Sequence, residues 1–129
     1  MIRKLSVVTI FVKDQEAAKD FYVNKLGFTV RSDDSKTIPG YRWLTVAPAE
    51  QKELEIVLNP AMTDEQRAVI GKQGTFVLDT DNCQVDYERL KAKGVKFRGE
   101  PKVQPYGTDV IFEDLYGNEF DLVQSPPRR

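Results

Sequence analysis

Apolar and polar residues follow two rhythms along this chain, and each rhythm predicts one kind of secondary structure. Short runs rich in β-branched and aromatic residues are typical of strands, whereas apolar residues three and four positions apart predict amphipathic helices. The predicted strands cover 5–12, 28–32, 41–46, 53–58, 75–80, 95–97, 108–113 and 119–124, and the predicted helices cover 15–26 and 83–93. This mixture of elements predicts an α+β protein.

Both predicted helices carry start and stop signals of the same kind. Asp14 and Asn82 stand where an N-cap side chain accepts backbone N–H groups, and Gly27 and Gly94 stand where a helix ends in a left-handed residue. The expected apolar stripes are Ala17, Ala18, Phe21, Tyr22 and Leu26 in the first helix, and Val85, Tyr87 and Leu90 in the second.

The order of the elements repeats once along the chain. Matching positions in the two halves stand 66 to 68 residues apart: Gly27 and Gly94, Trp43 and Val110, Glu55 and Asp121, Asp14 and Asn82. A constant offset over several elements predicts two βαβββ modules, about 1–58 and 74–125, joined by a linker over about 59–73. The 129 residues suit one domain built from these two modules.

Composition and charge narrow the classes of function. Hydrophobic residues make up 40% and charged residues 30%, which is typical of a globular protein with its own core. The 19 basic and 20 acidic residues nearly cancel, so we expect no nucleic-acid partner, and the Arg128–Arg129 pair is interpreted as a solvated tail. The single cysteine, Cys83, suits a reducing compartment. No run approaches the roughly 20 apolar residues of a membrane span, so we expect a cytoplasmic protein with no membrane partner.

Two segments resemble a known superfamily. They are VTIFVKDQEAAKDFYVNKLGF, over 8–28, and FEDLYGNEFDLVQ, over 112–124. Together they look like the vicinal oxygen chelate superfamily, which includes glyoxalase I, bleomycin-resistance proteins and extradiol dioxygenases. The resemblance implies tandem βαβββ modules whose curved mixed sheets surround a cleft. Some motif residues have a structural explanation as well, because Gly117 and Asn118 both tolerate the left-handed backbone of a hairpin turn.

The resemblance also implies four positions that hold the ligands of a divalent metal, called seats below. In this sequence they fall on Val7, Glu55, Thr75 and Asp121. In active members these seats hold mostly His and Glu. Here Val7 offers no donor and Thr75 offers only a neutral hydroxyl, whereas tight binding of a transition metal needs about three good donors. We therefore expect no tightly held metal and no cofactor. Extradiol cleavage is excluded, since it needs two histidines and the chain has none.

The two carboxylates at these seats leave two interpretations open. Glu55 alternates with apolar residues on a predicted strand, so it and Asp121 either face solvent or lie together in the cleft. In the cleft the two acids would repel, and one pKa would rise. One carboxylate would then act as a general base or accept a hydrogen bond from a cationic or hydroxylated ligand.

Three aromatic residues and one thiol complete the candidates. Tyr41 and Trp43 alternate with Arg42, so both rings are expected on one face, as the wall of a ligand site or as core. Tyr106 lies in a loop that the resemblance places beside the ligand. Cys83 begins a helix, which lowers a thiol pKa somewhat, but no histidine can activate it. The candidate ligand-binding residues are therefore Tyr41, Trp43, Glu55, Tyr106 and Asp121.

Three functions follow from these residues. The first is a metal-independent protein of the bleomycin-resistance kind that binds a small aromatic or cationic molecule in the cleft between the modules. The second is a lyase or isomerase that uses a weakly bound divalent metal at Glu55 and Asp121. The third is a non-catalytic regulatory domain. The residues leave open whether the protein is an enzyme, and the resemblance implies a homodimer.

Overall fold

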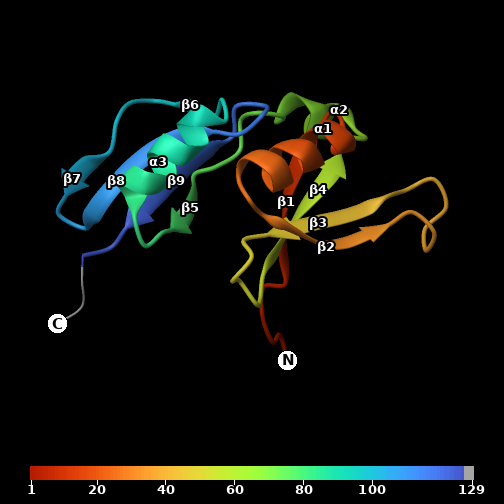
Figure 1. The fold of residues 1–129 in the computed structure, drawn as a ribbon. Helices are drawn as coiled ribbons and strands as arrows, with labels where there is room; N and C mark the ends of the chain where they lie inside the picture. Colours follow the sequence, from red (N-terminus) through yellow and green to blue (C-terminus); the bar gives the residue numbers. More distant parts are fainter. Residues whose placement is uncertain (127–129) are drawn as a thin grey trace. The chain divides into compact units, whose positions relative to one another are not determined.

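The structure is a computed structural model that describes residues 1–126, so the predicted Arg128–Arg129 tail lies outside the described residues. The chain forms two compact units, Met1–Ile70 and a second unit that begins at Gly71. Each unit has one mixed sheet, drawn in Figure 1 in red to yellow-green for the first unit and in green to blue for the second. No helix among the described residues is long and apolar enough to cross a membrane.

The first unit has the strand order β1-β4-β3-β2, in which β1 runs parallel to β4 and the other neighbours are antiparallel. Its elements are β1 (Val7–Val12), α1 (Gln15–Asp20), the π-helical turn η1 (Phe21–Lys25), β2 (Thr29–Asp34), β3 (Trp43–Ala47), β4 (Glu55–Pro60) and α2 (Asp64–Ala68). This is the predicted βαβββ order. The short helix α2 comes from the predicted linker, whose residues up to Ile70 belong to the first unit.

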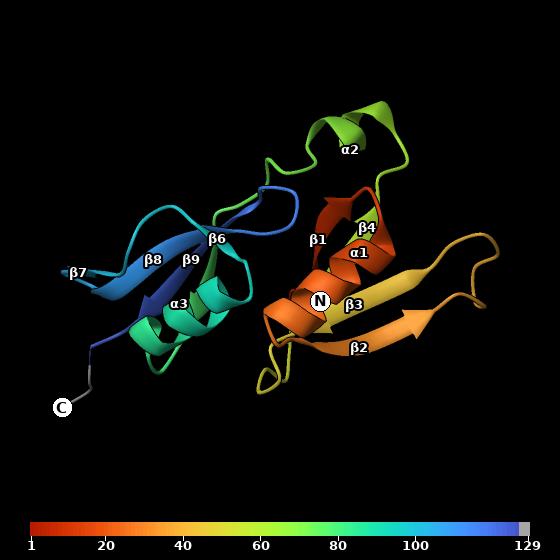
Figure 2. The same ribbon diagram turned by 45° about the horizontal axis from the view of Figure 1, so that its top comes forward.

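Helix α1 begins at its predicted cap. The Asp14 carboxylate accepts hydrogen bonds from the backbone N–H groups of Glu16 and Ala17 at 2.9 and 3.1 Å. After η1, Gly27 has the predicted positive φ, +80°. The buried stripe contains Ala18, Phe21, Tyr22 and Leu26. Ala17 is exposed instead, because it lies at the edge of this stripe. Figure 2 shows α1 lying across the strands of the first sheet.

The second unit repeats this topology with the strand order β5-β9-β8-β6. Its elements are β5 (Phe76–Asp79), α3 (Cys83–Ala92), β6 (Lys96–Phe97), β7 (Lys102–Gln104), β8 (Gly107–Glu113) and β9 (Glu119–Gln124). β5 runs parallel to β9, and β8 is antiparallel to its neighbours. The short strand β7 is not among the predicted elements. It pairs with the part of β8 that β6 leaves free, so the two short strands share one edge.

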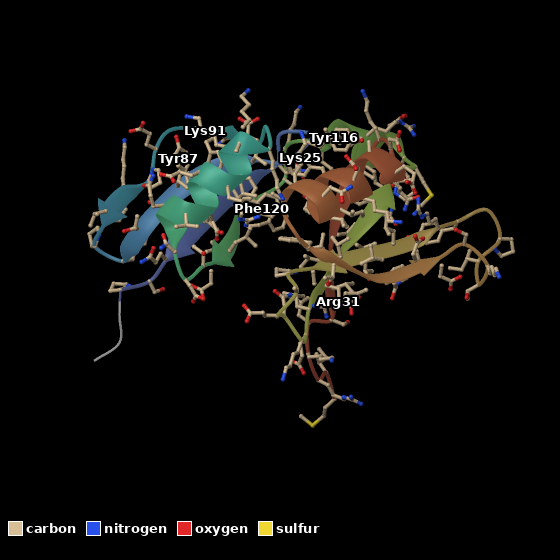
Figure 3. All side chains as sticks on the ribbon, in the orientation of Figure 1. Lys25, Arg31, Tyr87, Lys91, Tyr116 and Phe120 are labelled. Carbon is tan, nitrogen blue, oxygen red and sulfur yellow. The ribbon has the colours of Figure 1, made fainter. Side chains whose placement is uncertain are left out.

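Helix α3 covers one face of the second sheet, and its buried residues are Cys83, Tyr87 and Leu90. The prediction that Val85 belongs to the buried stripe is wrong, because Val85 is 55% exposed and faces away from the sheet. Aromatic rings form a row from the helix into the sheet, from Tyr87 through Phe97 and Phe112 to Phe120, with centroids 4.8, 5.6 and 5.2 Å apart, and the last pair is stacked. Figure 3 labels the two ends of this row, Tyr87 on α3 and Phe120 on β9.

The turn between β8 and β9 is held by two buried side chains. The Asp114 carboxylate accepts hydrogen bonds from the backbone N–H groups of Tyr116, Gly117 and Asn118 at 2.9 to 3.1 Å. The Asn118 amide donates to Asp114 at 2.8 Å and accepts from the Gln73 N–H at 2.9 Å. Gly117 has the predicted positive φ, whereas Asn118 does not. Asn118 therefore acts through its side chain, and its expected left-handed backbone is wrong.

Alternation along the strands leaves each sheet one face turned away from α1 or α3, called the distal face below. Residues of the first distal face are Val7, Thr9, Phe11, Trp43, Thr45, Ala47, Glu55, Val57 and Asn59. Residues of the second are Val77, Asp79, Asp109, Ile111, Asp121 and Val123.

The strand registers give the correspondence between the two units. Glu55 of β4 matches Asp121 of β9. On the neighbouring strands Thr45 lies opposite Val57, and Asp109 lies opposite Val123. Thr45 therefore matches Asp109. The predicted match of Trp43 with Val110 is therefore wrong. Thr45 and Glu55 stand 10 positions apart, whereas Asp109 and Asp121 stand 12 positions apart, so the offset between the two units is 66 on β4 and β9 but 64 on β3 and β8.

Candidate functional site

Glu55 begins β4 and lies on the distal face of the first sheet. Its neighbour in the parallel register is Val7, which has no donor atom to offer. The buried Thr45 hydroxyl donates a hydrogen bond to Oε1 of Glu55 at 2.7 Å. A neutral donor on the adjacent strand therefore orients this half-buried carboxylate.

The two aromatic candidates lie beside Glu55 on the same sheet. Trp43 begins β3 and is 37% exposed, and the Tyr41 hydroxyl is hydrogen-bonded to the Asn59 side chain on the same distal face. Arg42 turns to the other face, where it pairs with Glu16 of α1 at 2.7 Å. The predicted separation of the two rings from Arg42 thus agrees with the structure.

Arg31 of β2 fixes the loop that leads into Glu55. Its guanidinium donates to the carbonyls of Pro48, Ala49 and Gln51 at 2.8, 3.3 and 2.6 Å. One side chain thus holds three backbone groups of a loop that has no strand partner. These contacts fix the start of β4, where Glu55 stands. The sequence alone gave no indication of this role of Arg31. Figure 3 labels Arg31.

Asp121 occupies the equivalent position on the distal face of the second sheet. Its neighbour in the parallel register is Val77, as Val7 is the neighbour of Glu55. Asp109 of β8 is 8% exposed, and its carboxylate accepts a hydrogen bond from the protonated form of Asp121. Burial, this hydrogen bond and the charge of Asp109 raise the pKa of Asp121 to about 6.

Tyr106 lies next to this acid pair. Its hydroxyl donates to Oδ2 of Asp109 at 3.1 Å, while the residue remains 54% exposed. Burial and this bond raise the pKa of Tyr106. The structure therefore brings together Tyr106 and Asp121, two of the predicted site residues, through Asp109. Sequence reasoning missed Asp109, although an acid directly before the apolar residues of a predicted strand was a usable signal.

Thr75 lies apart from this pair. It precedes β5, and its hydroxyl donates to the Glu119 carboxylate, which is also paired with Arg98. These three side chains line a hollow of about 210 Å³ on the second unit. The strand register places Val77, not Thr75, opposite Asp121.

The residues present do not fit the metal that this fold carries in active relatives. The first sheet offers Glu55 beside Val7, and the second offers an acid pair beside Val77. The described part of the chain contains no group of three His, Cys, Asp or Glu side chains able to hold an ion. A transition metal needs about that many donors, so no step through a metal is derived.

Cys83 is the first residue of α3 and is buried against the second sheet, and its surroundings differ from the expected ones. Burial raises the pKa of the thiol, and the charges of Asp109, Asp86 and Asp121 raise it further. The expected lowering by the helix N-terminus is therefore wrong, because desolvation outweighs the helix dipole.

Residues 4–122 match the Glyoxalase/Bleomycin resistance protein/Dioxygenase superfamily, and the chain belongs to this family. Its two βαβββ sheets are the fold of that superfamily, as the resemblance implied.

Two solved structures and one further protein are similar to this chain over most of its length. UcmS2 is 44% identical, with 95% of this chain and 98% of that chain covered and a TM-score of 0.84. TnmS3, an antibiotic binding protein from Streptomyces sp. CB03234, is 34% identical, with 97% and 98% covered and a TM-score of 0.83. An uncharacterized protein from Shewanella frigidimarina (strain NCIMB 400) is 39% identical over 121 residues, which are 91% of this chain and 90% of that protein.

Proposed function

We propose that this protein binds a small molecule with a flat aromatic or cationic body and does so without a tightly held metal. The distal face of the first sheet carries the proposal. There Trp43 keeps 37% of its surface exposed, Tyr41 is held by Asn59, and Glu55 is oriented by Thr45. An exposed ring and a half-buried ring beside an oriented carboxylate suit a ligand with a ring and a polar group, because side chains that are already held lose little conformational entropy on binding.

The relatives and the seat residues support the same function. TnmS3 is described as an antibiotic binding protein, and it is similar to this chain over nearly its whole length. Val7 and Thr75 lack the donors that a catalytic metal would need. Tyr106 and Asp121 are the proposed ligand residues of the second sheet, and the proposal includes a homodimer in the cytoplasm.

The test uses the single tryptophan of the chain, Trp43, as its reporter. Acridine, a flat ring system that is neutral at pH 7.5, is titrated in buffer containing EDTA, and binding is followed by tryptophan fluorescence and by calorimetry. We expect saturable binding that quenches Trp43, with little response to cyclohexanol, which has no aromatic ring.

Two variants make this test specific. Trp43→Ala should weaken acridine binding at least about tenfold by calorimetry, since stacking on an aromatic ring is lost. Leu115→Ala removes another exposed apolar side chain, on the turn before β9, and should bind as the unaltered protein does. Binding that requires added Mn²⁺, or that Trp43→Ala leaves unchanged, would contradict the proposal.

A further inference from the structure

Leu54, the residue directly before Glu55, has a backbone conformation that a leucine does not favour. Its φ is +65°, and every other positive φ among the described residues belongs to a glycine. A left-handed leucine is costly, because its Cβ atom crowds the following carbonyl oxygen. Such a residue persists only where the contacts around it outweigh the cost, and residues of this kind cluster at functional sites. The strained residue leads straight into β4, which begins at Glu55.

The strained turn is closed by Gln51. The backbone N–H of Gln51 donates to the Pro48 carbonyl at 3.0 Å, and its side-chain amide donates to the carbonyl of Leu54. Residues 48–54, called the strap below, belong to no strand or helix. One residue in the middle of the strap therefore holds both of its ends.

Arg31 holds the strap from the neighbouring strand. The register of β2 with β3 shifts between Val30 and Ser32, so Arg31 has no partner on β3. A bulge of this kind redirects the side chain of the extra residue. Nε of Arg31 donates to the Thr29 hydroxyl at 2.9 Å, and Nη2 donates to three carbonyl oxygens of the strap. The bulge thus aims one guanidinium at the backbone of the strap.

The charge of Arg31 is directed at neutral acceptors alone. Arg31 is half-buried, and it forms no ion pair with any acid in the part of the chain that the structure describes. A charged donor makes stronger hydrogen bonds than a neutral one. These bonds therefore supply the kind of stabilisation that a left-handed Leu54 needs, and they act on the residues just before Glu55.

We propose that the clamped strap is the device that keeps Glu55 on the distal face beside Thr45. Leu54 supplies the strained turn into β4, and Arg31 with Gln51 keeps that turn closed. When the clamp is lost, the turn relaxes and Glu55 loses its 2.7 Å hydrogen bond from the Thr45 hydroxyl. Arg31 is therefore a positioning residue. The inference rests on the proposed function for the use of Glu55 in binding, and it adds the residues that set the direction of this carboxylate.

Amide hydrogen exchange followed by NMR tests the clamp without any ligand. Arg31→Met should raise the exchange rate of the Glu55 N–H at least about tenfold relative to that of Val57, in the middle of β4. A loss of global stability would speed the exchange of Val57 as well, so the ratio isolates a local opening. Arg67→Met removes an exposed guanidinium on α2 that holds no loop, and it should leave the ratio unchanged.

A second comparison tests the strain at Leu54. Leu54→Gly and Leu54→Ala both remove the side chain, but only glycine adopts a left-handed backbone at little cost. Combined with Arg31→Met, Leu54→Gly should give a Glu55 N–H that exchanges about tenfold more slowly than Leu54→Ala does. Should Arg31→Met fail to fold, the two substitutions are compared in Gln51→Ala, which removes only the side-chain bond to Leu54 and should raise the Glu55 to Val57 ratio in the same direction.

A pair of neutral dyes connects the clamp to binding. Acridone has an N–H group that can donate to a carboxylate, and 10-methylacridone has the same flat body without it. Calorimetry in buffer with EDTA should show the unaltered protein binding acridone at least about fivefold more tightly. Arg31→Met should bring this affinity ratio close to one while the affinity for 10-methylacridone is kept, which a general loss of stability would not do.

The outcomes separate the two proposals. An unchanged ratio of Glu55 to Val57 exchange in the clamp variants overturns the positioning role, as does equal exchange with Leu54→Gly and Leu54→Ala. Retention of the acridone preference in Arg31→Met also overturns it. Absence of binding of both dyes by the unaltered protein counts against the proposed function, and equal affinity for the two removes Glu55 from the binding site. In both cases the exchange rates still decide the positioning role.

Discussion

Asp109 and Thr45 occupy the same place in two copies of one unit, yet they have opposite effects on the acid beside them. The hydroxyl of Thr45 supplies a proton to a hydrogen bond with Glu55, so that carboxylate remains satisfied while it is charged. Asp109 brings a second negative charge to Asp121 in a partly buried place. Like charges in a poorly solvated site favour the protonated form of one of them. The second sheet therefore holds an acid whose charged form opposes folding.

This acid predicts an unusual dependence of stability on pH. The folded-state pKa of Asp121 is about 6, against an ordinary value of 3.8, so between these values the folded state binds more protons than the unfolded state. The free energy of unfolding should thus fall as the pH rises from 4 to 6. Asp33 behaves in the opposite way, because Arg42 lowers its pKa from 3.8 to about 2. Its stabilising effect is lost only as the pH falls below 3.8.

Asp121→Asn should remove this dependence. At pH 7.5 we expect the free energy of unfolding to rise by about 1–2 kcal/mol, after allowance for solvent screening, with little change at pH 4. Urea denaturation at the two pH values measures both quantities. Asp79→Asn, which alters an exposed acid on the same face, should leave the pH profile as it is. A profile for Asp121→Asn identical to that of the unaltered protein would contradict the assignment.

At the scale of the elements, the turn between β8 and β9 sets the position of the acid pair. Asn118 is fully buried and ties the turn to Gln73 at the entry to β5 through its side chain. The same amide holds Asp114, which gathers three backbone N–H groups of the turn. This short turn also fixes the register that places Asp109 diagonally across from Asp121.

Asn118→Ala should be strongly destabilising. The substitution removes the hydrogen bonds that the Asn118 amide makes with the Gln73 N–H and with the Asp114 carboxylate, and each such loss costs about 1–3 kcal/mol. We expect the free energy of unfolding to fall by about 2–4 kcal/mol in urea. Gln84→Ala, which removes an exposed amide on α3, should stay within about 0.5 kcal/mol. A loss for Asn118→Ala no larger than this control would show that the turn does not depend on its side chain.

The sequence was sufficient for features that depend on neighbours along the chain. The caps Asp14 and Asn82, the glycine at 27 and the order of the strands all follow from local chemistry. The strand ends were less predictable, and Leu5 lies outside β1, because a strand ends where its partner does. The Asp109–Asp121 contact was out of reach, since it depends on the register that the turn between β8 and β9 sets.

At the scale of the whole molecule, the described surface keeps several large apolar residues exposed. Ile2 and Leu5 precede β1, Val77 lies on the distal face of the second sheet, and Val103 lies on the edge strand β7. Isolated exposed apolar residues are ordinary on a monomer, so these residues mark only the positions at which the proposed homodimer is best tested.

The homodimer can be tested directly by the mass in solution. Sedimentation equilibrium should give twice the 14.7 kDa of one chain at micromolar concentration. Val77→Lys places a charge on the distal face and Val103→Lys places one on the edge strand, so a shift toward monomer in either variant locates the contact. Lys52→Glu, an exposed change of charge elsewhere, serves as the control. A mass of one chain at all concentrations would contradict the homodimer.

The strand order has a consequence for how the chain is made. In each sheet the strand synthesised last in its unit, β4 or β9, lies between two others, and it pairs in parallel with the strand synthesised first. During translation β1 must wait for residues 55–60 to leave the ribosome before it gains a partner, and β5 must wait for 119–124. Such distant pairings are slow to form. Each unit is therefore expected to fold in one late step, when its last strand becomes available.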